Sequence, residues 1–220
     1  MPRLVERQGM PDMAVIGEPT GLCACVAQRG QLLLRIVWLG EQLHAGWAAS
    51  SVPAPVNAIT AAAAELTGVL CLDVAPRHPL LGDVAITPTM IEAGVARNVT
   101  PPRCSVVLDV RTTPLSSHLE IVEAIRTAVT AEVEVLSDRL VPAETPCGSS
   151  LLGALRRCAP EIVETASPTC SDWVFLRAAD AFKLGPGDSR RSHTADEWIE
   201  VGQVERAVDI YRALARQVLR

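Results

Sequence analysis

Apolar residues occupy every second position in two segments of the chain, residues 31–38 and 103–111. This spacing places the apolar side chains on one face of an extended backbone, so both segments are predicted β-strands. Arg111 falls on the polar face, at the end of the second strand. Shorter apolar or alternating runs predict further strands at residues 12–16, 84–90, 132–136 and 180–184.

Elsewhere the apolar residues recur every three or four positions, the period of an amphipathic helix. One such segment, residues 56–70, follows Pro53 and Pro55. Ser117 and Glu120 have the Ser-x-x-Glu spacing of a capping box, which predicts that a second helix begins there. Two further helices are expected at residues 149–158 and 204–218.

The order of these elements predicts two domains. Residues 28–140 contain strand, helix, strand, strand, helix and strand, the βαββαβ order of a ferredoxin-like unit. Residues 1–27 and 141–220 contain the strands and helices of an α/β domain, but too few to close a sheet by themselves. We therefore expect a partial α/β domain that is interrupted by a ferredoxin-like α+β domain.

Composition excludes several classes of protein. Of the 220 residues, 49% are hydrophobic and 20% are charged, which is the balance of a folded domain and not of a disordered chain. The net charge of -5 gives no basic surplus, so neither nucleic acid nor an anionic membrane is an expected partner. The seven cysteines are odd in number, and there is neither a secretory signal pattern nor an apolar run of about 20 residues. A cytoplasmic location is expected.

Two turn-rich segments follow predicted strands and could carry chemistry. Glu18 stands in a Gly-Glu-Pro-Thr turn after the first strand, and a Gly-Pro-Gly loop that leads to His193 follows the last. Loops at the carboxyl ends of strands build the sites of α/β folds. A lone histidine is more often a surface residue, and Thr194 with Glu197 could equally form a capping box before a helix.

Six short motifs strengthen the functional interpretation because they occur in a particular order. They are Gly-Glu-Pro-Thr (17–20), Leu-His-Ala-Gly (43–46), Arg-Asn-Val-Thr-Pro (97–101), Leu-Asp-Val-Arg (108–111), Ser-Asp (171–172) and Gly-Pro-Gly through His-Thr (185–194). Together they resemble the di-zinc peptidase and deacylase family that includes acetylornithine deacetylase and succinyl-diaminopimelate desuccinylase. The resemblance implies an α/β catalytic domain interrupted by a ferredoxin-like lid through which two subunits form a homodimer.

The resemblance also implies roles for particular residues. Glu18 and His193 match ligands of the two zinc ions, for which cobalt or manganese could substitute. His44 resembles the lid histidine that reaches into the partner subunit's site and stabilises the oxyanion. Asn98 and Arg111 resemble the lid residues that hold the substrate carboxylate, and an arginine fork suits this task.

Some of these assignments have simpler structural alternatives. Arg111 could instead form a surface salt bridge with Asp109, and Ser-Asp at 171–172 is also a common N-cap. In the family interpretation, Gly185 and Gly187 let the backbone approach the substrate.

Part of the family's site has no match in this sequence. The family's His-x-Asp motif, bridging aspartate and Glu-Glu pair precede the Gly-Glu-Pro-Thr turn, whereas only 16 residues precede Gly17, none of them histidine. We expect a chain without the N-terminal half of the catalytic domain, inactive on its own.

The complete protein is expected to be a zinc-dependent amidohydrolase. It would remove an acyl group, most simply acetyl, from an N-acyl amino acid such as acetylornithine or acetylcitrulline in arginine biosynthesis. Succinyl-diaminopimelate desuccinylase and dipeptidase activities are alternatives within the family. A non-catalytic dimerisation or regulatory subunit is an alternative of a different class.

Overall fold

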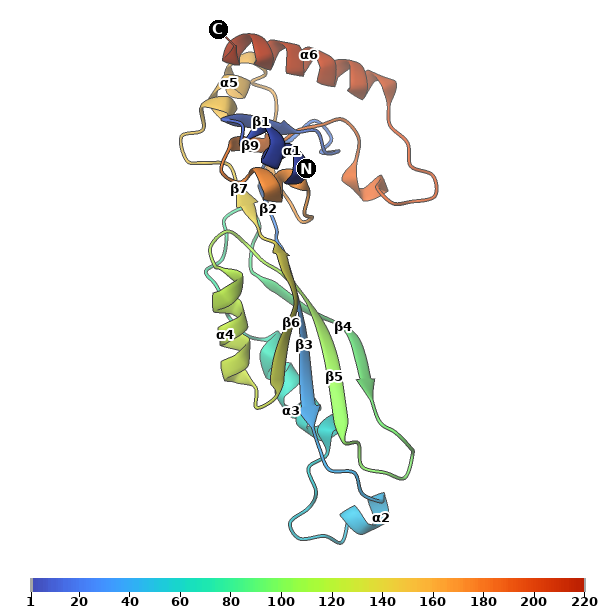
Figure 1. Ribbon diagram of the computed structural model, residues 1–220. Helices are drawn as coiled ribbons and strands as arrows, with labels where there is room; N and C mark the ends of the chain where they lie inside the picture. Colours follow the sequence, from blue (N-terminus) through green and yellow to red (C-terminus); the bar gives the residue numbers. More distant parts are fainter. Residues whose placement is uncertain (1, 220) are drawn as a thin grey trace. The chain divides into compact units, whose positions relative to one another are not determined.

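The computed structural model describes residues 2–219, and the chain divides into two compact units (Figure 1). The first unit comprises the residues up to Gly30, Pro79–Leu81 and the residues from Pro142 onward. The second comprises Gln31–His78 and Gly82–Val141. Each unit has its own sheet and its own hydrophobic core.

The second unit contains a four-stranded antiparallel sheet in the order β4-β5-β3-β6. With the strands counted along the chain this is the order 2-3-1-4, which is ferredoxin-like and confirms the predicted fold class. The paired central strands run from Leu32 opposite Val110 to Leu39 opposite Arg103. The strands are β3 (Gln31–Leu39), β4 (Ala85–Ala93), β5 (Arg103–Arg111) and β6 (Glu132–Leu140).

Two helices, α3 (Ala58–Leu70) and α4 (His118–Ala128), contribute to one core with this sheet. Leu34, Ile36 and Leu108 have no exposed surface, and burying such a side chain stabilises the fold by about 1.5–3 kcal/mol. The capping box at the start of α4 is confirmed. The Glu120 backbone N–H donates to Ser117 Oγ (3.2 Å), and the Ser117 backbone N–H donates to the Glu120 carboxylate (2.7 Å).

The first unit contains a five-stranded mixed sheet. β1 pairs with β9 in parallel, β9 pairs with β2, and β2 also pairs with β7 and β8. Within residues 2–219, β1 pairs with β9 alone and is therefore an edge strand. The strands are β1 (Met13–Ile16), β2 (Ala24–Gln28), β7 (Ala143–Glu144), β8 (Glu164–Ser167) and β9 (Asp180–Lys183).

Successive residues of β9 face opposite sides of this sheet, as in any β-strand. Phe182 belongs to a core cluster with residues of α5 (Ser150–Cys158) and α6 (Val201–Val218), whereas Ala181 packs with Trp173 on the other side. The remaining elements of the unit are α1 (Pro2–Gln8) and the short 3-10 helices η1 (Asp172–Leu176) and η2 (Ser189–Arg191).

Three features differ from what the sequence patterns predict. The capping box proposed for Thr194 and Glu197 is absent, because α6 begins only at Val201 and Thr194 Oγ1 donates instead to the Arg191 carbonyl (2.7 Å). Strands β2, β7 and β8 escape detection because β7 has only two residues, and β2 (Ala-Cys-Val-Ala-Gln) and β8 (Glu-Thr-Ala-Ser) lack a run of large apolar side chains. A four-residue helix, α2 (Ala45–Ala48), is likewise too short for a helical period. No helix between residues 2 and 219 combines the length and apolarity that a membrane span requires.

Candidate functional site

The Gly-Glu-Pro-Thr turn and the Gly-Pro-Gly loop are held together by backbone hydrogen bonds. The N–H groups of Thr20 and Leu22 both donate to the Gly185 carbonyl, at 3.1 and 3.0 Å, and the Gly185 N–H donates to Thr20 Oγ1 (3.1 Å). A Cβ at Gly185 would collide with the Glu18 carbonyl oxygen and lie 2.9 Å from the Gly17 carbonyl oxygen. Gly185 is thus required for the close approach of the two turns, whereas its approach to a substrate stays a prediction.

The Gly-Glu-Pro-Thr turn and the residues that follow the Gly-Pro-Gly loop, 188–191, line a cavity of about 420 Å³ in the first unit. Glu18 is half-buried and lines this cavity, as do Cys25 of β2 and Ser167 of β8. Gly187, with φ +91°, turns the second loop so that its N–H donates to Gln203 Oε1 of α6 (2.7 Å). Four separate segments of the chain, within residues 18–25, 165–169, 183–191 and 200–203, therefore converge around this cavity.

The most buried charged group in this cavity is Lys183, which ends β9 and is only 2% exposed. Its ammonium donates to Ser167 Oγ (2.7 Å) and to the Thr169 carbonyl (3.4 Å). Burial lowers the pKa of Lys183, and the Glu18 carboxylate offsets this in part. Sequence reasoning missed this residue, although a lysine inside the apolar run Ala-Phe-Lys-Leu is a visible signal of a special environment.

An arginine and an aspartate are paired on the rim of the cavity. The Asp188 carboxylate accepts hydrogen bonds from the Arg190 guanidinium (2.7 Å) and backbone N–H (3.0 Å), which lower the pKa of Asp188 to about 2. The next arginine, Arg191, stacks on the Trp198 ring with its guanidinium carbon 3.4 Å from the ring centroid. Both guanidinium groups are thus already engaged within the chain.

The two predicted metal ligands do not form a complete metal site. Glu18 lines the cavity, but His193 is exposed in the segment after η2, has φ +64° and is not among the lining residues. Across residues 2–219, no group of three or more His, Cys, Asp or Glu side chains is placed to hold a metal ion. Zinc sites take three or four protein ligands, so the donors described here do not fit a zinc ion.

His44 and Asn98 lie next to each other in the second unit. A β-bridge joins His44 to Val99, and the Ala45 N–H donates to the Asn98 carbonyl (2.8 Å). The exposed His44 side chain caps α2, where its Nδ1 accepts from the Gly46 N–H (3.1 Å). These two predicted site residues are therefore brought together.

Arg111 lies at the opposite end of the same sheet. Asn98 precedes the Arg103 end of β5, and the strand extends roughly 26 Å from there to Arg111. The Arg111 guanidinium binds both carboxylate oxygens of Asp109, with Nε at 2.7 Å and Nη2 at 3.0 Å. This is the Arg111–Asp109 salt bridge that the sequence offered as the simpler alternative to substrate binding. The structure does not bring Asn98 and Arg111 of one chain to a common carboxylate.

Asp172 has a structural setting that agrees with its simpler interpretation. It is the first residue of η1, and the preceding Ser171 is the N-cap, whose Oγ accepts from the Trp173 N–H (3.3 Å). Ser171 also donates to Gln28 Oε1 (2.8 Å). Ser171 thus anchors the start of η1 to β2.

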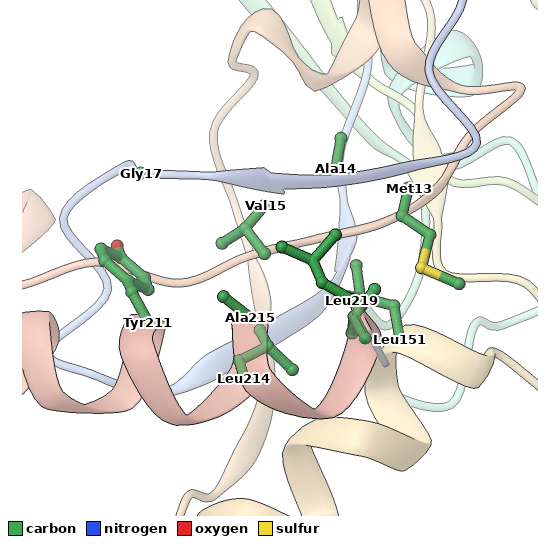
Figure 2. A pocket seen from close by; sticks show the side chains of 10 residues that line it. Met13, Ala14, Val15, Gly17, Leu151, Tyr211, Leu214, Ala215 and Leu219 are labelled. Carbon is green, nitrogen blue, oxygen red and sulfur yellow. The ribbon is translucent and has the colours of Figure 1, made fainter.

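A second cavity, of about 380 Å³, lies between β1 and α6 (Figure 2). Met13, Val15, Leu214 and other apolar side chains line it, and none of the lining residues within 2–219 is charged. The Tyr211 hydroxyl donates to the Leu184 carbonyl (2.5 Å), so the polar end of this side chain is already satisfied. Chemistry is therefore assigned to the cavity around Glu18 and not to this one.

Comparison with known proteins identifies the family to which the chain belongs. The model of the M20 peptidase dimerisation domain matches residues 26–135, which is half of the chain. The chain belongs to the M20 peptidase family. A Pyrobaculum aerophilum protein assigned as a LysW-lysine/LysW-ornithine hydrolase is 30% identical over 200 residues, which are 90% of this chain and 56% of the relative. Acetylornithine deacetylase of Proteus mirabilis is 28% identical over 212 residues, 89% of this chain and 53% of the relative.

Solved structures of the M20 type share the fold. The aminopeptidase PepT of Bacillus cereus matches with a TM-score of 0.73 and 19% identity, over 94% of this chain and 57% of that protein. An M20 family metallo-carboxypeptidase of Sulfolobus solfataricus matches with a TM-score of 0.71 and 15% identity, over 97% and 65%. The M20 chain described here therefore spans little more than half the length of the curated relatives that it matches.

Proposed function

We propose that this M20 chain is part of an amidohydrolase that removes an acyl group from an N-acyl amino acid. Acetyl is the proposed acyl group, and acetylornithine or acetylcitrulline of arginine biosynthesis is the proposed substrate. The observation that carries the proposal is the cavity in which the Gly-Glu-Pro-Thr turn, locked to the Gly-Pro-Gly loop, presents Glu18. The names of the relatives, an acetylornithine deacetylase and a LysW-lysine/LysW-ornithine hydrolase, support an amino-acid derivative as the substrate.

Glu18 and His193 are proposed ligands of a zinc ion, or of cobalt or manganese, in the complete enzyme. Since residues 2–219 do not complete a metal site, the proposal requires further donors beyond these residues. No catalytic step is therefore assigned to a metal bound by this chain alone. The enzyme is proposed to work in the cytoplasm, with neither nucleic acid nor membrane as a partner.

A homodimer through the second unit is the proposed assembly. β4 is an edge strand with two uncovered apolar side chains, Met90 (58% exposed) and Ile91 (66% exposed). Unpaired edges of this kind readily add a strand from another chain. Because Asn98 and Arg111 of one chain lie at opposite ends of the sheet, we propose that one bound carboxylate meets Arg111 of one subunit and Asn98 of the other. His44 of the subunit that supplies Asn98 is the proposed oxyanion-stabilising residue.

Ligand binding and metal content test the proposal separately. Saturation-transfer NMR with acetylornithine, acetylcitrulline, succinyl-diaminopimelate and a dipeptide would rank the substrate classes on the purified chain. We expect the acetylated amino acids to bind best, and Arg111→Met and Asn98→Ala to weaken binding by roughly tenfold or more, the effect of losing a charge-assisted or buried hydrogen bond. Equal binding by both variants and the parent chain would refute these recognition roles.

A non-catalytic dimerisation subunit is the second candidate function. It is favoured by one observation, a complete ferredoxin-like dimerisation fold in a chain whose described residues hold no metal cluster. The purified chain, supplied with zinc, is expected to hold less than one equivalent of the metal and to release no acetate from acetylornithine. Stoichiometric zinc with turnover would rule out the non-catalytic candidate.

A further inference from the structure

Lys183 is the single lysine of the chain, and its ammonium lies at the floor of the cavity around Glu18. It donates two hydrogen bonds, to Ser167 Oγ at 2.7 Å and to the Thr169 carbonyl at 3.4 Å. An ammonium group has three N–H donors. One donor is thus available to a molecule that enters the cavity.

The buried ammonium has no counter-ion in direct contact among the described residues of its own unit. Among residues 2–219, no carboxylate forms an ion pair with Lys183, and Glu18 acts on it only at longer range. The neighbouring Cys25 thiol supplies no charge near neutral pH, because burial raises its pKa. A buried charge that only neutral oxygens solvate is costly, so a bound anion would stabilise it strongly.

We propose that this cavity binds the carboxylate group of a small organic acid, with the Lys183 ammonium as its counter-ion and Ser167 holding that ammonium in place. A charge-assisted N–H to O hydrogen bond at the floor would then replace the missing ion pair. The inference concerns the same cavity as the proposed function, but it requires neither a metal nor hydrolysis of any amide, so a failure to detect hydrolysis would leave it standing.

The other charges of the cavity select a monoanion. The charge of Arg190 is offset by its ion pair with Asp188, and Arg191 is held against the Trp198 ring. The carboxylates of Glu18 and Glu200 line the wall. They would repel a dianion such as hydrogen phosphate more strongly than they repel a carboxylate.

The single lysine makes a direct test possible. Protein labelled with 15N at the lysine Nζ gives one side-chain ammonium signal, which reports on Lys183 alone. We expect sodium acetate to shift this signal along a saturable curve at constant ionic strength, and acetamide, its neutral analogue, to leave it in place. A linear drift with acetate, or the same response to acetamide, would overturn the proposal.

Variants then distinguish acetate binding at Lys183 from a general effect of removing a positive charge. Lys183→Met keeps an unbranched side chain, one atom shorter, without the charge, and is expected to weaken acetate binding, measured by calorimetry, by about 10- to 100-fold. Ser167→Ala should weaken it less. Arg126→Met, which removes an exposed cation of the other unit, should bind acetate like the parent chain. Unchanged affinity in Lys183→Met, or tighter binding of phosphate than of acetate by the parent chain, would contradict the assignment.

Discussion

Gly185 packs directly against the backbone of Glu18, with no space for a side chain between them. The contact joins the end of β9 to the end of β1, and a Cβ at Gly185 would overlap the Glu18 carbonyl oxygen. The backbone of Glu18, the candidate metal ligand, can therefore take this position only if residue 185, which lies 167 residues further along the chain, has no Cβ.

Gly185→Ala is expected to lower the free energy of unfolding by about 1–3 kcal/mol, the usual cost of forcing an extra group into a packed site. Chemical denaturation followed by circular dichroism would measure it. Gly153→Ala is the matched control, because Gly153 lies within α5 and a Cβ there would meet only Arg157 Nη1, at 3.5 Å. That change should stabilise by about 0.5–1 kcal/mol, and equal losses in both variants would refute the steric argument.

Ser117→Ala should destabilise the second unit by about 1 kcal/mol, because it removes the N-cap of α4. Its neighbour provides the control: the Ser116 hydroxyl is buried and has no hydrogen-bond partner in the described structure. Ser116→Ala is therefore expected to be neutral or slightly stabilising. Thermal melts of the two variants would give the comparison, and a larger loss in Ser116→Ala would contradict the observed cap.

Asp180 makes the stability of the first unit depend on pH. Burial alone would raise its pKa, but hydrogen bonds from the Leu151 N–H and from Ser149 and Ser150 together lower it below the ordinary value. A lowered folded-state pKa gives stability that is present above the unfolded-state pKa and is lost as the pH falls through the folded-state value.

Asp180→Asn should therefore be less stable than the parent chain near neutral pH, with a difference that shrinks below about pH 4. Urea denaturation across this range would measure the difference. Asp196→Asn, in an exposed loop, serves as the control and should show no such trend. A difference between Asp180→Asn and the parent that is constant with pH would show that the carboxylate charge is not responsible.

Ile91→Lys tests the proposed dimer. A charged side chain on an edge strand opposes pairing with a second chain, so the variant should be monomeric where the parent chain is dimeric. Light scattering coupled to size exclusion would measure the mass of each. Leu119→Lys changes a similarly exposed apolar residue on α4 and should leave the dimer intact. Dissociation by Leu119→Lys but not by Ile91→Lys would place the interface elsewhere.

Periodicity predicted the second unit well because its elements are long enough to show their period. The strand at Arg103–Arg111 has the same bounds in sequence and structure, and the Ser117–Glu120 capping box fixed the start of α4. By contrast, β7 has two residues and α2 has four, so neither contains a full repeat. The Thr194–Glu197 pattern failed because the backbone at His193 takes a positive φ and no helix follows directly.

The candidate site was only partly predictable for a related reason. Motifs identify residues, but only the fold shows which ones meet. Glu18 and the Gly-Pro-Gly loop do meet, through hydrogen bonds that no local pattern encodes. Lys183 belongs to no motif, and its burial depends on Ser167 and Thr169, which lie on a different segment.

The length of β5 has a genetic consequence. Under the proposed dimer, an Asn98→Ala subunit retains its own Arg111, and an Arg111→Met subunit retains its own Asn98. Each homodimer of a single mutant type would lack a complete recognition pair, but a heterodimer of the two would rebuild one. Two alleles that are each defective alone should therefore complement each other when they are expressed together in one cell.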